Sequence, residues 1–504
     1  MRFPVFAAAA MQVAAACAAL PFRAGERVVF LGDSITRLGN HLRVVEDYVL
    51  TRYPGVDIRF RNAGVGGDTA SACVGRIEND VTAFSPAWIT VMFGMNDISR
   101  SNYVADPTQQ QIDARNRALA THKTKMTSLR ERLATDNPGA SLVWCTPSPY
   151  DEGVVYAHTV NVSVGANVAL GECAAFVRGL VSANGDRLVE FYTAMNEYNE
   201  ERQRTDRSFT LCGTDRIHPG KAGGLFMGWR YLKDMGADAL VSSVTVDAQS
   251  GACVAAANAT VTGVEKIENG VKFTIRENAL PFPVDPEAAK VAETLPLAED
   301  LNSEIVQVTG LGEGLYALAI DGDEVAWATG TEWAAGVNLA FNKNTPQFRL
   351  AARISERNAA RNQNESDLRI LHMIRWWLGR QGITNVDDFD EIRGNTNSLP
   401  QTGFYAEHIP MYLEQWPQHQ QLWQAVEDEW TALVAMAKTV SHEYAVTKVV
   451  KNRPEIVTEG QDAVKAFVSP STGEVVVKYR LIGQPAVITA TIRVNGEIVP
   501  AATE

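Results

Sequence analysis

Short apolar runs alternate with amphipathic stretches over the first half of the chain. Such runs are typical of strands buried on both faces, and they lie at 28–31, 58–62, 88–93, 141–146 and 187–191. Between them apolar residues recur at helical spacing, for example in 119–133 and 168–181. Alternating strands and helices are joined by right-handed crossovers. The pattern therefore predicts an α/β domain of the flavodoxin-like, three-layer type with a parallel five-stranded sheet, ending near residue 238.

The pattern changes after residue 238. Segments of β type fill residues 241–340, and the pairs Asn269–Gly270 and Asp321–Gly322 fall between neighbouring runs, which is a strong signal for β-hairpins. We therefore expect a small antiparallel β domain here, with the proline-rich residues 280–296 as a loop or crossing strap.

The last third of the chain has two further regions. Residues 341–446 have a helical pattern, and residues 455–504 return to β-type alternation. The helical region contains the pair Trp376–Trp377, for which we expect core packing, although these residues could instead anchor the helix against another domain. The C-terminal β segment would either join the 241–340 sheet or form a small module of its own.

The charge balance excludes some classes of partner. A net charge of −13 argues against nucleic acid, because phosphates are bound by lysine and arginine. It argues equally against an anionic membrane surface. Beyond the N-terminus no stretch is long and apolar enough to suggest a transmembrane span in the mature chain. The sequence does not indicate an oligomeric state.

Residues 1–20 have the layout of a secretory signal peptide, with one arginine, an apolar run and small residues suited to cleavage. We therefore expect a secreted or periplasmic protein. Residues 14–17 weakly resemble a bacterial lipoprotein box, so anchoring through Cys17 is an alternative, and an apolar N-terminal helix packed on the domain is another. The other five of the six cysteines are widely spaced and fit neither a disulfide framework nor a zinc site.

Ser34 is the first candidate for chemistry. It follows the first apolar run through Gly32 and Asp33, and residues 43–51 beyond it have helical spacing. A serine at a strand-to-helix turn lies at the edge where open α/β sheets bind ligands, near a helix N-terminus. Such a serine is a candidate nucleophile, although most Gly-Asp-Ser tripeptides are turns or helix caps.

Two further strand ends carry groups that can stabilise an oxyanion. The glycine-rich residues 62–69 follow the second run, and Gly67 allows the backbone there to turn an N–H towards a ligand. Gly94 and Asn96 follow the third run, and the side-chain N–H of Asn96 can serve the same purpose. The glycine-rich stretch lacks both the lysine and the glycine spacing of nucleotide-binding loops.

Asp215 and His218 offer a base for the nucleophile. A serine nucleophile needs a base of near-neutral pKa, and the imidazole needs a carboxylate that orients it and stabilises its charged form. Only His218, of the eight histidines, combines a nearby aspartate with a position just before an expected helix. The other histidines are expected on the surface or in the core. His158 is the least certain of them, because it lies in a loop expected to border the site.

In order and position, these four blocks resemble those of the SGNH hydrolases, the GDSL-type esterase and lipase superfamily, over residues 25–238. The resemblance implies that Ser34 is the catalytic nucleophile, that His218 is the general base and that Asp215 orients the histidine. The implied reaction is acyl transfer from an ester to Ser34 and then to water. It needs no cofactor and no metal.

The resemblance also implies an oxyanion hole. Its donors would be the backbone N–H groups of Ser34 and Gly67 and the side chain of Asn96. Gly66 departs from the family pattern, since many members have serine there, and we expect this to affect loop rigidity more than chemistry. Asp33 and Asp97 are expected to brace the loops.

The substrate is the least defined part of the prediction. Tyr150 and Asp151 follow the fourth run and should border the pocket, where Tyr150 could be a platform for a sugar ring or could equally anchor the loop or the core. An exported esterase with a small β domain suits a polymeric substrate. We expect a secreted serine esterase that removes O-acetyl groups from carbohydrate, whether a small molecule or a polysaccharide. The alternatives are a lysophospholipase or thioesterase with the same triad, and an inactive glycan-binding or scaffolding protein.

Overall fold

The computed structural model describes residues 20–156, 162–383, 385–395 and 398–449, and beyond these the backbone of five short strands. The expected signal peptide with Cys17, and His158, lie outside the described residues. The terminal strands are β15 (Ile456–Thr458), β16 (Val464–Val468), β17 (Val475–Tyr479), β18 (Ala490–Val494) and β19 (Glu497–Val499). They pair only among themselves in the described part of the chain, as a three-stranded and a two-stranded sheet, so they do not extend the sheets described below.

The first domain is built on a parallel five-stranded sheet, as predicted. Its strands are β1 (Arg27–Gly32), β2 (Arg59–Gly64), β3 (Trp88–Met92), β4 (Ser141–Cys145) and β5 (Arg187–Val189), in the spatial order β2-β1-β3-β4-β5. Gly32 pairs with Gly64 on one side and with Met92 on the other. Three strands therefore end level with one another, and the loops that follow them meet at one edge of the sheet.

Helices cover both faces of this sheet because successive residues of a strand point to opposite sides. Val28 and Phe30 of β1 pack on the side of α2 (Asn40–Arg52) and α7 (Lys221–Asp234). Val29 and Leu31 pack on the other side, with α3 (Ile77–Asp80), α4 (Gln109–Asp136) and the C-terminal half of α5 (Ala166–Asn184). α6 (Tyr192–Gln203) follows β5. This is the three-layer arrangement that the alternating pattern predicted.

The β-type residues after 238 form two sheets that share one apolar core. The first sheet has the order β13-β10-β6-β7, with β6 (Leu240–Asp247), β7 (Ala252–Ala257), β10 (Ser303–Thr309) and β13 (Val337–Asn338). The second has the order β12-β11-β14-β9-β8, with β8 (Ala259–Ile267), β9 (Gly270–Glu277), β11 (Leu315–Ile320), β12 (Asp323–Thr329) and β14 (Ser441–Lys448).

Two details of the sequence-based division are wrong. β6 and β10 pair in parallel, so the region is not purely antiparallel. Parallel neighbours need a crossover, which residues 278–302 provide through short helical turns, among them α8 (Ala289–Ala292) and α9 (Leu297–Asp300). β14 lies at the end of the region expected to be helical and inserts between β9 and β11, because its alternating residues Tyr444 and Val446 complete the apolar core.

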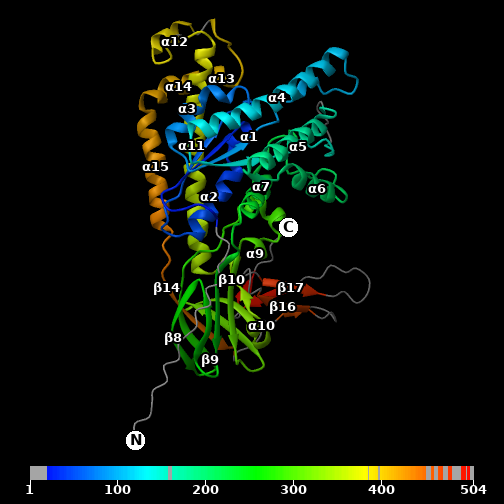
Figure 1. Cartoon of the computed structure of the whole chain (residues 1–504). Helices are drawn as coiled ribbons and strands as arrows, with labels where there is room; N and C mark the ends of the chain where they lie inside the picture. Colours follow the sequence, from blue (N-terminus) through cyan, green and yellow to red (C-terminus); the bar gives the residue numbers. More distant parts are fainter. Residues whose placement is uncertain are drawn as a thin grey trace.

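The helical region, from α11 (Pro346–Arg380) to α15 (His419–Met436), lies along the α/β domain and is called the strap below. α11 leaves the β sandwich and runs beside α2 and β2, and α15 returns next to it towards β14 (Figure 1). α12 (Phe389–Asn395), α13 (Phe404–Glu407) and α14 (Ile409–Gln415) lie at the far end of this strap. No helix among the described residues has the length and apolar character needed to cross a membrane.

Buried polar contacts join the strap to the α/β domain. The Arg361 guanidinium of α11 binds Glu46 of α2 at 2.6 Å and Glu365 of its own helix at 3.0 Å. The Glu365 carboxylate accepts a hydrogen bond from the backbone N–H of Asn62 at the end of β2. Isolated buried charges are costly, and these charges have partners. The strap is therefore part of the packing at the edge of the sheet where β2 ends.

Candidate active site

Ser34 is the first residue of α1 (Ser34–Leu38), which begins directly after β1. Asp33 caps this helix, since its Oδ1 accepts a hydrogen bond from the N–H of Ile35 at 2.9 Å. A side chain at Gly32 would come within 2.2 Å of Thr36 Oγ1, and one at Gly64 would come as close to the backbone nitrogen of Arg37. The turn can therefore be this tight only because glycine occupies both strand ends.

A chain of hydrogen bonds links Ser34, His218 and Asp215. Ser34 Oγ lies 2.7 Å from His218 Nε2, and His218 Nδ1 lies 2.5 Å from Asp215 Oδ2. The other carboxylate oxygen, Oδ1, accepts from the backbone N–H groups of Ile217 and His218. Partial burial would raise the pKa of Asp215, but the hydrogen bonds from His218 and from the backbone hold it below its usual value. The group that faces the imidazole is thus an ionised carboxylate at neutral pH.

The turn before α7 holds these two side chains in place. Arg216 has a positive φ of 69°, an unfavourable conformation for a residue with a side chain. Its guanidinium compensates by donating to the carbonyls of Asp151 and Val154, at 2.9 and 2.8 Å. A side chain at Gly213 would come within 2.2 Å of the His218 carbonyl oxygen, which again requires glycine.

Gly67 and Asn96 lie at the neighbouring strand ends. Gly67 has a φ of 74°, which glycine adopts readily. The Asn96 side chain donates to the carbonyl of Asp68, the residue that follows Gly67, at 3.0 Å. Asp97 Oδ1 accepts from the N–H of Ala70 at 3.0 Å. The loops that follow β2 and β3 are therefore bonded to each other next to Ser34.

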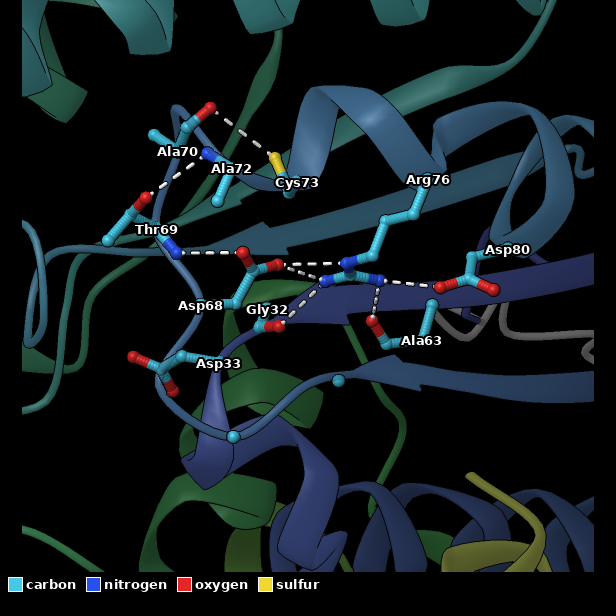
Figure 2. A network of polar contacts seen from close by, with 12 residues as sticks. Gly32, Asp33, Ala63, Asp68, Thr69, Ala70, Ala72, Cys73, Arg76 and Asp80 are labelled. Carbon is cyan, nitrogen blue, oxygen red and sulfur yellow. Dashed lines mark hydrogen bonds and ion pairs between the residues drawn. The ribbon is translucent and has the colours of Figure 1, made fainter. Parts of the chain in front are cut away.

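Arg76 ties the loop after β2 to the ends of β1 and β2 (Figure 2). Its guanidinium donates to the carbonyl oxygens of Gly32 at 3.1 Å and Ala63 at 2.6 Å, and it binds the carboxylates of Asp68 at 2.6 Å and Asp80 at 2.9 Å. All four partners are buried with it. One side chain thus fixes the distance between the β1 end that carries Ser34 and the β2 loop that carries Gly67.

Arg369 of α11 extends this network into the strap. It binds Asp80 through both guanidinium nitrogens, at 3.0 and 2.7 Å. Burial would raise the pKa of Asp80, but Arg369 and Arg76 hold it well below its usual range. The acid is therefore ionised between two cations.

Asp33 has the opposite environment. Burial, together with the charges of Asp97 and Asp68, raises its pKa to about 7, and the hydrogen bond from Ile35 opposes this only in part.

Among the described residues no group of three or more His, Cys, Asp or Glu side chains could hold a metal ion.

Tyr150 and Asp151 do not fit the substrate contacts expected from the sequence. Tyr150 is only 2% exposed, and its hydroxyl accepts from the N–H of Ser163 at 3.1 Å. Asp151 is buried and accepts from the N–H groups of Gly153 and Val154 and from Gln203. The loop after β4 turns inward and bonds to itself, so both residues anchor it and leave no face for a sugar.

Sequence reasoning missed the supporting arginines. Arg76 lies between Cys73 and Ile77, which are both buried, so an arginine on an otherwise apolar face was the available signal. Arg369 carried no comparable signal, because its partner Asp80 is distant in sequence.

Comparisons with known proteins relate the α/β domain to a family and the longer chain to a solved structure. Residues 30–224 match the model of the GDSL-like Lipase/Acylhydrolase family. An acetylxylan esterase from Geobacillus stearothermophilus is 24% identical over 227 residues, which are 42% of this chain and 94% of that protein. A solved structure of a gut microbial diltiazem-metabolizing enzyme is 27% identical, with a TM-score of 0.79 over 86% of this chain and all of that one. The second similarity extends beyond the α/β domain, so the additional regions share that protein's architecture too.

Proposed function

We propose that this chain uses Ser34 as a nucleophile and removes acetyl groups from carbohydrate esters. It is a carboxylic ester hydrolase, and its α/β domain belongs to the GDSL-like lipase and acylhydrolase family. The observation that carries the proposal is the continuous hydrogen-bonded chain from Ser34 through His218 to Asp215. Such a chain is what converts a weakly nucleophilic hydroxyl into an effective one.

The reaction proceeds in two acyl transfers. Ser34 Oγ attacks the ester carbonyl while His218 Nε2 takes its proton, and Asp215 stabilises the imidazolium that results. The oxyanion is held by the N–H groups of Ser34 and Gly67 and by the side chain of Asn96. His218 then gives the proton to the departing alcohol oxygen. Water repeats the sequence on the acyl-enzyme and releases the acid.

The name of one relative, an acetylxylan esterase, supports acetyl esters of a carbohydrate as the substrates. The other relative metabolizes diltiazem, which is therefore included among the test substrates below. We also infer export to the periplasm or the medium, because residues 1–20 have the pattern of a signal peptide.

Covalent labelling tests the nucleophile. A serine-reactive fluorophosphonate should label the wild type stoichiometrically and leave Ser34→Ala unlabelled, while Ser85→Ala, a serine away from the triad, labels normally. Asp215→Asn should still fold but should lower kcat by about 10²–10⁴-fold, because the imidazole loses its orienting carboxylate. Labelling that persists in Ser34→Ala would refute the assignment.

Acid release tests the substrate. Purified protein is incubated with acetylated xylo-oligosaccharides, diltiazem, and p-nitrophenyl esters from acetyl to octanoyl. We expect acetyl esters to be preferred and the sugar acetates to give the highest kcat/KM. A preference for octanoyl over acetyl would instead indicate a lipid-directed hydrolase.

A further inference from the structure

Arg37 lies three residues after Ser34 on α1, one helical turn away on the same side. Its guanidinium has no hydrogen bond or ion pair in the described part of the chain, and its Nε is buried without a partner. A methyl group placed on Gly66, the residue before Gly67, would lie 3.8 Å from that Nε. An unneutralised cation therefore lies between the nucleophile helix and the loop of the proposed oxyanion hole.

The ring of Phe404 lies next to this cation. The Arg37 Cζ is 5.7 Å from the ring centroid, a cation–π arrangement that orients the guanidinium without neutralising it. Phe404 belongs to α13 and is 38% exposed, so part of its ring is open to solvent. One edge of the site is thus formed by the strap.

Contacts on the neighbouring residue hold Phe404 in place. The Tyr405 hydroxyl donates to the carbonyl of Gly66 at 3.2 Å. Trp377 stacks on the Tyr405 ring, with centroids 5.5 Å apart and planes within 5°. Trp377 is partly buried and packs against the apolar core of the strap, so the expected core packing is confirmed for this residue. Trp376 is also partly buried but is not among the described residues of that core.

The unpaired state of Arg37 contrasts with its surroundings. Acidic residues outnumber basic ones by 59 to 46, and nearby cations such as Arg61 and Arg369 have carboxylate partners. Burial lowers the pKa of Arg37, whereas Tyr405 and Asp367 act in the opposite direction without forming an ion pair. A partly desolvated guanidinium with free N–H donors is a strong site for a carboxylate, which it can bind through two parallel hydrogen bonds.

We propose that Arg37 and Phe404 form a substrate subsite for a carboxylate on the alcohol part of the ester, that is, for an acetylated sugar that carries or adjoins a uronic acid. The inference rests on the proposed function. An acetyl group has only two carbons and ends near Ser34, so only the alcohol part can extend as far as Arg37. The exposed Phe404 ring packs against the apolar face of the sugar while Arg37 binds its carboxylate.

The test compares matched substrates. kcat/KM is measured for an acetylated xylo-oligosaccharide bearing glucuronate and for the same compound with its carboxylate reduced to an alcohol. The wild type should prefer the acidic substrate by about 10-fold or more, the effect of one charge-assisted contact. In Arg37→Gln this ratio should fall to about 1, and Arg37→Lys should retain part of it, because lysine keeps the charge but loses the bidentate geometry.

Two controls separate the possible outcomes. Arg276→Gln, at an exposed arginine of β9, should leave both rates and their ratio unchanged. Binding of the same acidic oligosaccharide to the Ser34→Ala protein, measured by calorimetry, should weaken about 10-fold when Arg37→Gln is added. An active esterase with a ratio near 1 in the wild type overturns this proposal alone. Absence of any ester hydrolysis overturns the proposed function, and the calorimetry still decides the subsite.

Discussion

Arg76 and Arg37 both lie against the loop that follows β2, but their guanidinium groups have opposite surroundings. Arg76 is buried and contacts two carboxylates and two carbonyl oxygens. Arg37 has none of these contacts and shares its space with an aromatic ring. A cation whose donors are all satisfied holds the loops together and has nothing left for a ligand. A cation whose donors are free does little for the fold but can recognise substrate.

The largest effect is expected when the buried contacts of Arg76 are removed. Arg76→Met leaves the carboxylates of Asp68 and Asp80 with fewer or no counter-charges and two carbonyls without donors. The free energy of unfolding should fall by about 3–5 kcal/mol. kcat should fall more than 10-fold, because the Gly67 loop is no longer held to the end of β1. Urea unfolding and steady-state kinetics measure both, and a loss below about 1 kcal/mol would contradict the role assigned to Arg76.

Arg369→Met should have a smaller effect of the same kind. Asp80 loses one of its two cations but keeps Arg76. We expect a loss of about 1–3 kcal/mol in unfolding free energy, with kcat reduced less than in Arg76→Met, because Arg369 acts on the site only through Asp80. If the two variants lose kcat equally, then the strap and not the Arg76 contacts positions the loops.

Asp33 provides the acidic counterpart, a buried carboxylate that has no cationic partner among the residues that the structure describes. Its pKa is about 7 in the fold and near 3.8 in the unfolded chain, so the folded state binds the extra proton. The stability that Asp33 contributes is fully present below about pH 4 and is lost as the pH rises to about 7. Asp33→Asn keeps an acceptor for Ile35 and removes this titration. Its unfolding free energy should decline less between pH 5 and pH 8 than that of the wild type, by about 1–3 kcal/mol.

The smallest effect on stability is expected at Arg37. Arg37→Gln removes no ion pair and no hydrogen bond of the guanidinium, so the unfolding free energy should change by no more than about 0.5 kcal/mol. Arg276→Gln should have a similarly small effect on urea unfolding. The two variants should differ only in the substrate ratio, which falls in Arg37→Gln and stays at the wild-type value in Arg276→Gln. A loss of several kcal/mol in Arg37→Gln alone would show that Arg37 is a structural cation like Arg76.

Much of the α/β domain could be predicted from local pattern. Apolar runs and helical spacing specify strands and helices in turn, and chirality then leaves few topologies for the sheet. The same reasoning brought Ser34, Gly67 and Asn96 to one edge, because each follows a strand of a parallel sheet. His218 and Asp215 could be paired because only three residues separate them. These inferences depend on periodicity and short spacing, which the sequence displays directly.

Only the tertiary structure decided which polar groups meet across long separations. Arg369 reaches Asp80, and Phe404 reaches Arg37, from a strap that local pattern identified only as helical. The same holds for Tyr150. Its sequence position fits both an exposed and a buried ring, and only the packing of its loop shows that the ring is buried. Periodicity reports which face of an element is apolar, but not which distant element covers it. The free energy of a buried charge depends on that partner, so the supporting network and the open subsite both emerge only in the folded chain.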